Sequence, residues 1–152
     1  MAESKQLLFL CTGNYYRSRF AELWFNHRAE REELDWRATS GGLGLVPERN
    51  SGCISQFTRT RLAERGVRLE EPVRFPVAST VEDLRRAERI IAMKRAEHEP
   101  LLRLRFPDDH LRVEYWQIDD VDCELPDCAL EKLEQQVERL ILELAGLRSA
   151  DR

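Results

Sequence analysis

The stretch LLFLCTGNYYRS at residues 7–18 joins a short apolar run to a polar loop and then to a helical pattern. The apolar run has the length of a strand and is continuous rather than alternating, which predicts a buried parallel strand. The pair Gly13-Asn14 marks a tight loop, and apolar residues recur at helical spacing from Ser18, a suitable N-cap, to about Leu34. This order of strand, loop and helix N-terminus is typical of a site that binds an anion through main-chain N–H groups.

Cys11 and Arg17 stand at the two ends of this loop. A guanidinium can bind two oxygens of a phosphate-sized anion, and the same positive field favours the thiolate of the cysteine, which is the nucleophilic form. The Cys-x5-Arg spacing recurs at Cys53 and Arg59. That second copy has no glycine in its loop and no strand before it, and its apolar spacing suits a helix, so we interpret Cys53 as structural.

The segment CTGNYYRS at residues 11–18 resembles the phosphate loop of the low-molecular-weight protein tyrosine phosphatase family, whose nucleophilic cysteine also lies near the N-terminus. The resemblance continues along the chain in family order. The segment 35–42 resembles the second strand and the loop after it, 90–93 the third strand, and 116–120 the late loop that carries an acid. The resemblance implies a cysteine-dependent phosphomonoester hydrolase.

The remaining patterns predict an α/β protein with an open four-stranded parallel sheet and helices on both faces, like the fold of that family. Strands are expected at 6–10, 35–40, 88–93 and 111–116, and helices at 18–34, 54–65, 79–87, 94–104 and 126–146. The 79–87 helix opens with a capping-box signature at Ser79, and Pro100 interrupts the 94–104 helix. We expect residues 1–152 to form one phosphatase-like domain, with its site where the loops after strands one, two and four converge.

The resemblance assigns roles to individual residues. It implies Cys11 as the nucleophile, Arg17 as the phosphate-binding cation and Asp120, four residues after Trp116, as the general acid, with Asp119 as the alternative. It also implies that the phosphate is bound by Thr12, Gly13, Asn14, Tyr15, Tyr16 and Ser18, that Ser40 supports Asn14, and that the loop 41–52 forms a substrate wall. The reaction would pass through a cysteinyl-phosphate without a metal or another cofactor.

Several positions depart from the family pattern. Tyr16 replaces a second cysteine that can protect the oxidised nucleophile, Arg19 and Val121 replace prolines, and Glu71 stands where a histidine is common. The aromatic residue expected in the wall loop is missing near Leu45. We expect these changes to alter the choice of substrate more than the catalytic mechanism. His98 is interpreted as a cap or packing residue rather than a base, because no cysteine or serine lies beside it in the sequence.

Composition limits the partners. A chain of 152 residues with 42% apolar content can bury an ordinary core, and a net charge of −4 with a pI near 5.5 argues against a general binder of nucleic acid or anionic membranes. The arginines 59, 61 and 65 could together prefer an acidic partner. The apolar run near the N-terminus is too short for a signal peptide, and four cysteines without CxxC spacing fit a reducing compartment. We therefore expect a cytoplasmic monomer acting on a phosphorylated protein or a small phosphomonoester.

Three alternatives remain open. An arsenate reductase-type redox enzyme would need a close cysteine pair after the third strand, but residues 94–107 contain none, and Cys123 and Cys128 lie elsewhere. A non-catalytic phosphate-binding module would be favoured if the acid loop is misplaced. A phosphatase for phosphoarginine or a small metabolite would use the same loop.

Overall fold

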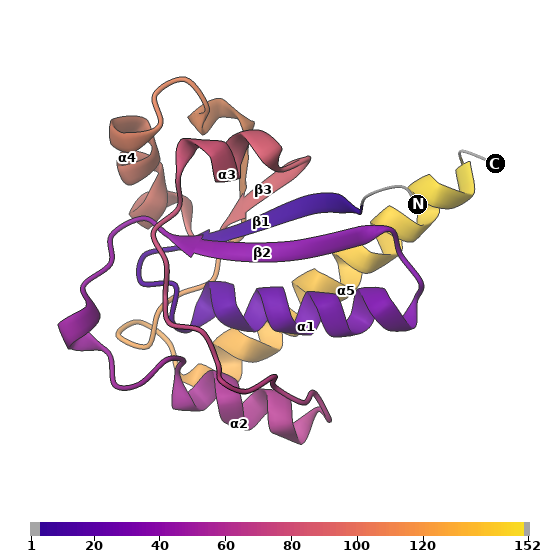
Figure 1. Cartoon of the computed structure of the whole chain (residues 1–152), viewed down its shortest axis with the longest axis horizontal. Helices are drawn as coiled ribbons and strands as arrows, with labels where there is room; N and C mark the ends of the chain where they lie inside the picture. The colour runs from indigo at the N-terminus through magenta and orange to yellow at the C-terminus, as the bar shows by residue number, and fades with distance from the viewer. Residues whose placement is uncertain (1–3, 151–152) are drawn as a thin grey trace.

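The computed structural model describes residues 4–150 and is built around a parallel four-stranded sheet in the order β2-β1-β3-β4 (Figure 1). Strand β1, Lys5–Cys11, pairs with β2, Trp36–Gly42, on one side and with β3, Arg89–Ala92, on the other. Strand β4, Val113–Tyr115, pairs with β3 at the edge of the sheet. The predicted open parallel sheet is confirmed.

Helices cover both faces of the sheet (Figure 1). Helices α1, Arg17–Arg31, α2, Gln56–Glu64, and α5, Pro126–Ala150, lie on one face. Helices α3, Val81–Arg86, and α4, Arg95–Arg105, lie on the other. Alternate side chains of β1 therefore enter two separate cores, Leu7 and Phe9 on the first face and Leu8 and Leu10 on the second. Burial on both faces explains why the sequence of β1 is continuously apolar.

The order of the strands brings four loops to the carboxyl edge of the sheet. The segment 12–16 follows β1, 43–55 follows β2 with a short 3-10 helix at Pro47–Arg49, and 93–94 follows β3. A second 3-10 helix, His110–Arg112, leads into β4, and the segment 116–125 leaves it. In a parallel sheet this edge is where ligand sites form. Cys11 ends β1 at this edge and lies opposite Gly42 in the register of the sheet.

Some predicted boundaries are wrong. Helix α1 begins at Arg17 with Tyr16 at the N-cap, so Ser18 is not the cap. Helix α3 is capped by Thr80 rather than Ser79, and Asp83 completes its capping box. Helix α2 begins at Gln56, two residues later than expected. Helix α5 continues to Ala150 and is not ended by Gly146.

The arginines 59, 61 and 65 form ion pairs within the chain. Arg61 and Arg65 of α2 both pair with Glu134 of α5, and Arg59 pairs with Glu71. The two pairs with Glu134 hold α2 against α5.

Candidate active site

Residues 12–16 link β1 directly to α1. Among residues 4–150, the main-chain N–H groups of this loop donate no hydrogen bond to another protein group, whereas its carbonyls are used: the N–H of Leu43 reaches Cys11 O at 2.9 Å and that of Gly44 reaches Thr12 O at 3.0 Å. A Cβ on Gly42 would lie 2.8 Å from Thr12 O, so a glycine is needed where β2 passes the loop. Unpaired donors beside a helix N-terminus are suited to bind an anion.

Asn14 gives the loop its shape. Its φ of 49° is the left-handed conformation that the sequence predicts, and the residue is fully buried. Its Nδ2 donates to the hydroxyls of Ser18 and Ser40, both at 2.9 Å. Its Oδ1 accepts from Arg74 Nη1 at 3.0 Å and from the main-chain N–H of Val77 at 3.1 Å. One side chain thus connects the phosphate loop to β2 and to the crossover before α3.

Cys11 is 3% exposed, and its Sγ lies 2.9 Å from Ser18 Oγ. Because Ser18 Oγ already accepts a hydrogen bond from Asn14, the Ser18 hydroxyl proton is free to donate to the sulfur. A hydroxyl that donates to Sγ stabilises the thiolate. The absence of a capping role for Ser18 is therefore explained, since its side chain turns toward the cysteine.

Arg17 is 2% exposed and is held from two sides. Its two terminal nitrogens bind Glu97 of α4 in a bidentate pair, with Nη1 to Oε2 at 2.9 Å and Nη2 to Oε1 at 2.8 Å. Nη1 also donates to the carbonyl of Ile118 at 3.0 Å. Burial alone would lower the pKa of Arg17, but the hydrogen bonds that Arg17 donates to Glu97 and the negative charges of Cys11, Glu97 and Asp120 outweigh it and raise the pKa. Arg17 is a fixed cation beside the loop.

Glu97 and His98 join α4 to the phosphate loop through Thr12. The Thr12 hydroxyl lies 2.6 Å from Glu97 Oε1 and 2.9 Å from His98 Nε2. Burial would raise the pKa of Glu97, yet the hydrogen bonds from Arg17 and Thr12 hold it at about 2. Burial lowers the pKa of His98 to about 4, so the imidazole is neutral at pH 7. With its Nδ1 proton on the carbonyl of Lys94, 3.1 Å away, the Nε2 of His98 is an acceptor, so it can only share with Glu97 the single hydroxyl proton of Thr12.

The two aspartates of the acid loop have different surroundings. Asp119 lies 2.5 Å from Lys94 Nζ in an ion pair. Asp120 Oδ2 lies 3.5 Å from Arg17 Nη2, and its Oδ1 accepts from the main-chain N–H of Val121 at 2.8 Å. Only Asp120 lines the same cavity as Cys11, because Asp119 is turned toward α4.

The cavity over the phosphate loop has a volume of about 290 Å³. Its base includes Cys11, Gly13 and Arg17, and its walls are Tyr15, Tyr16, Arg49, Asn50, Ser55, Phe57, Asp120 and Val121. The Tyr15 hydroxyl donates to the carbonyl of Ser51 and so ties the loop to the wall segment. Tyr16 is 6% exposed, and its ring packs edge-on against Phe57 at 6.3 Å between centroids. The mouth of the site is therefore rich in aromatic side chains.

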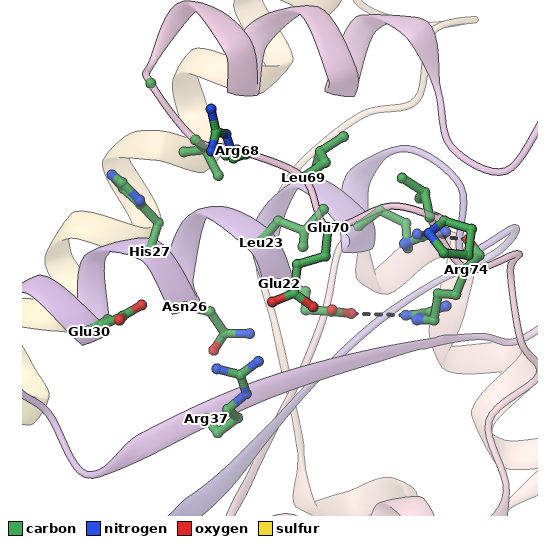
Figure 2. A pocket seen from close by; sticks show the side chains of 15 residues that line it. Glu22, Leu23, Asn26, His27, Glu30, Arg37, Arg68, Leu69, Glu70 and Arg74 are labelled. Carbon is green, nitrogen blue, oxygen red and sulfur yellow. Dashed lines mark hydrogen bonds and ion pairs between the residues drawn. The ribbon is translucent and has the colours of Figure 1, made fainter.

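Besides the predicted contact with Ser40, Asn14 is held by Arg74, which sequence analysis does not single out. Glu71, at the position where the family often has a histidine, pairs with Arg59. Arg74 also donates to Glu22 at 2.9 Å, and Glu22 accepts from Ser40 Oγ at 2.5 Å. Figure 2 shows Glu22 and Arg74 facing each other at one end of a larger cavity, of about 610 Å³, that lies beside α1 and does not include Cys11.

Arg19, at a position where the family has proline, is buried beside Asn14 and Arg74. It donates to the carbonyls of Asn14, Cys53 and Arg74 at 3.0 to 3.4 Å. Burial and the nearby charge of Arg74 lower its pKa to about 10, which leaves it protonated at neutral pH. The carbonyl of Cys53 thus accepts a hydrogen bond from Arg19. Residues 56–64 form a helix, so the second Cys-x5-Arg copy is not a phosphate loop.

Two further classes of site are missing from residues 4–150. They contain no group of three or more histidine, cysteine, aspartate or glutamate side chains placed to hold a metal ion. No helix among them is long and apolar enough to span a membrane.

Comparisons with known proteins agree with this geometry. A family model described as low molecular weight phosphotyrosine protein phosphatase matches residues 6–145. No curated protein sequence gives a significant match. Among solved structures, the YwlE arginine phosphatase from Geobacillus stearothermophilus is 20% identical with a TM-score of 0.77 and coverage of 97% of each chain. A low molecular weight protein tyrosine phosphatase from Bacillus subtilis is 24% identical with a TM-score of 0.72, covering 97% of this chain and 99% of that one.

A thioredoxin-dependent arsenate reductase from Corynebacterium glutamicum is 21% identical with a TM-score of 0.69, covering 95% of this chain and 63% of that one. The TM-scores of these three structures establish a shared fold, and the family match spans nearly the whole chain. Together with the strand, loop and helix that carry Cys11 and Arg17, that match means that the chain belongs to the low molecular weight phosphotyrosine protein phosphatase family, whose members are cysteine-dependent phosphatases.

Proposed function

We propose that this chain hydrolyses phosphomonoesters at Cys11 through a cysteinyl-phosphate intermediate. The observation that carries the proposal is the loop of unpaired main-chain N–H groups between Cys11 and Arg17. The main-chain N–H groups from Thr12 to Ser18 bind the phosphoryl oxygens, and the guanidinium of Arg17 adds a positive charge beside them. The negative charge that spreads over these oxygens in the transition state is stabilised by N–H donors that are already in place.

In the first step the Cys11 thiolate attacks phosphorus, and the bond from phosphorus to the alcohol or phenol oxygen breaks. Asp120 in its acid form donates its proton to that leaving oxygen, a role supported by its place in the same cavity as Cys11. The Ser18 hydroxyl, 2.9 Å from the sulfur, stabilises the thiolate before attack. We assign Asp119, which is paired with Lys94, no part in proton transfer.

In the second step water attacks the cysteinyl-phosphate. Asp120, now a carboxylate, accepts a proton from that water, the bond from sulfur to phosphorus breaks, and inorganic phosphate leaves with Cys11 restored as the thiolate. Ser18 again stabilises the sulfur as a leaving group. The cycle is balanced without a metal or another cofactor.

The aromatic mouth supports an aryl phosphate as substrate. Tyr15, Tyr16 and Phe57 line the approach to Cys11, and Arg49 adds a positive charge. We propose phosphotyrosine on a protein as the physiological class, with phosphoarginine and small phosphomonoesters as the alternatives to be tested. We further propose that residues 1–152 act as one monomeric domain in the cytoplasm, consistent with four free cysteines.

The deciding experiment measures turnover of p-nitrophenyl phosphate and of matched peptides that carry phosphotyrosine, phosphoserine or phosphoarginine. We expect turnover of the aryl phosphate and highest kcat/KM for the phosphotyrosine peptide among the peptides. Highest kcat/KM for phosphoarginine would keep the mechanism and reject the substrate class. No turnover of any substrate, with phosphate still bound, would favour a non-catalytic phosphate-binding module.

A further inference from the structure

A second cavity, of about 220 Å³, lies next to the catalytic cavity. We name it the apolar subsite, and its walls are Leu45, Val46, Pro47, Phe75 and Pro76. No charged side chain lines it, although 34% of the residues in the chain are charged. Phe75 is 66% exposed and lines one cavity with four other apolar residues, and contiguous apolar surface of this kind is typical of a ligand groove.

The apolar subsite opens from the catalytic cavity itself. Gly13 of the phosphate loop and Asn50 of the wall segment line both cavities. A Cβ built on Gly13 would lie 3.5 Å from Asn50 Nδ2, so the two residues meet at the boundary between the cavities. A group that enters the apolar subsite is therefore adjacent to a phosphoryl group bound on the loop.

The wall of the subsite formed by Phe75 and Pro76 is fixed by the same contacts that hold the phosphate loop. Arg74, which binds Asn14 Oδ1, also donates to the carbonyl of Phe75 at 3.1 Å. On the other side of Phe75 and Pro76, the N–H of Val77 donates to Asn14 Oδ1 at 3.1 Å. The exposed ring thus stands on main chain that is anchored at both ends, and the apolar surface is formed before any ligand arrives.

We propose that the apolar subsite binds one apolar side chain of a polypeptide substrate, within two residues of the phosphorylated residue. This proposal rests on the proposed function and names its substrate more closely. An extended chain advances about 3.3 Å per residue, so the neighbours of a residue seated over Cys11 reach an adjoining cavity. A volume of about 220 Å³ suits a single side chain and is below the roughly 300–1,000 Å³ of pockets for whole small molecules.

The test compares phosphotyrosine peptides that differ at one position, with leucine or serine placed in turn at each of the two positions before and after the phosphotyrosine. Burying a leucine side chain predicts a leucine-to-serine ratio in kcat/KM of about tenfold or more at one position. In the Phe75→Ser variant that ratio should fall to within about threefold of unity, because the apolar wall is lost. Leu111→Ser, at a position that is 87% exposed and outside both cavities, is the matched control and should keep the wild-type ratio.

The ratio is taken within each variant, so a partial loss of folded protein cancels. A wild-type ratio below about twofold at all four positions, or a Phe75→Ser variant that keeps the full ratio, would overturn the proposal. Turnover of p-nitrophenyl phosphate is measured alongside, because its absence would contradict the proposed function rather than the subsite. In that case the same peptides are titrated calorimetrically into Cys11→Ser protein, and equal affinity for the leucine and serine peptides would overturn the subsite on its own.

Discussion

Replacing Glu97 by glutamine tests the contact between α4 and the phosphate loop. The change keeps the size of the side chain but removes its charge, and one carboxylate oxygen that faces Arg17 becomes an amide that must turn away or repel it. Arg17, 2% exposed, then keeps its charge without its bidentate partner, because the remaining oxygen can accept from only one of its two terminal nitrogens. The effect falls on the residue that ends the phosphate loop.

The magnitude follows from the ion pair. A pKa lowered from its usual 4.5 to about 2 corresponds to about 3 kcal/mol, and because Glu97 is 31% exposed, solvent screening reduces this to about 2 kcal/mol. We expect Tm to fall by roughly 4–8 °C at neutral pH. Because Arg17 is then held less firmly, kcat/KM for p-nitrophenyl phosphate should fall by about 10- to 100-fold, and inorganic phosphate should inhibit less strongly.

The pH dependence has a defined sign. The folded-state pKa of Glu97 is depressed, so its stabilisation is fully present above about pH 4.5 and is lost as pH falls toward about 2. The difference in unfolding free energy between wild type and Glu97→Gln should shrink over that range. Glu99→Gln is the matched control, since Glu99 lies on the same helix but pairs with the exposed Arg95 and Arg103. If both variants show equal activity and equal inhibition by phosphate, the positioning role of Glu97 is refuted.

Three further outcomes are expected. Cys11→Ser should lose at least about 10³ in turnover while still binding phosphate or vanadate, and Cys53→Ser should be nearly neutral; equal losses would mean that the wrong copy of the spacing was chosen. The pH profile of kcat/KM should be bell-shaped, and Asp120→Asn rather than Asp119→Asn should flatten one limb and lower kcat by about 10²–10⁴. Peroxide should inactivate the enzyme by overoxidation of Cys11, as mass spectrometry can detect, and full recovery with dithiothreitol through a disulfide to another cysteine would contradict this.

The sheet and the phosphate loop were predictable because their signals are local. A continuous apolar run, a glycine-asparagine pair and a helical pattern fix β1, the loop and α1 within residues 5–31. Asn14 was recognisable as the left-handed residue for the same reason. The boundary errors at Ser18 and Ser79 arose where a serine side chain that suits an N-cap bonds elsewhere or leaves the cap to its neighbour.

The contacts behind the loop were not predictable from local patterns. Glu97 and His98 reach Thr12, and Glu97 also reaches Arg17, from 80 to 86 positions away, through the packing of α4 beside β3. The available signal was an adjacent pair of ionisable residues on the helix that follows the third strand, at the edge of the sheet where the site forms. Arg74 lies in an irregular crossover that has no periodicity, so its contact with Asn14 depends on the tertiary fold alone.

The central claim is that Cys11 carries the phosphoryl group during turnover. Rapid acid quench of the enzyme with an aryl phosphate, followed by intact mass and peptide mapping, measures this directly. We predict one phosphoryl group on Cys11, formed at least as fast as turnover and absent from Cys11→Ser protein. Turnover without a covalent adduct, or an adduct on Cys53 instead, would contradict the account.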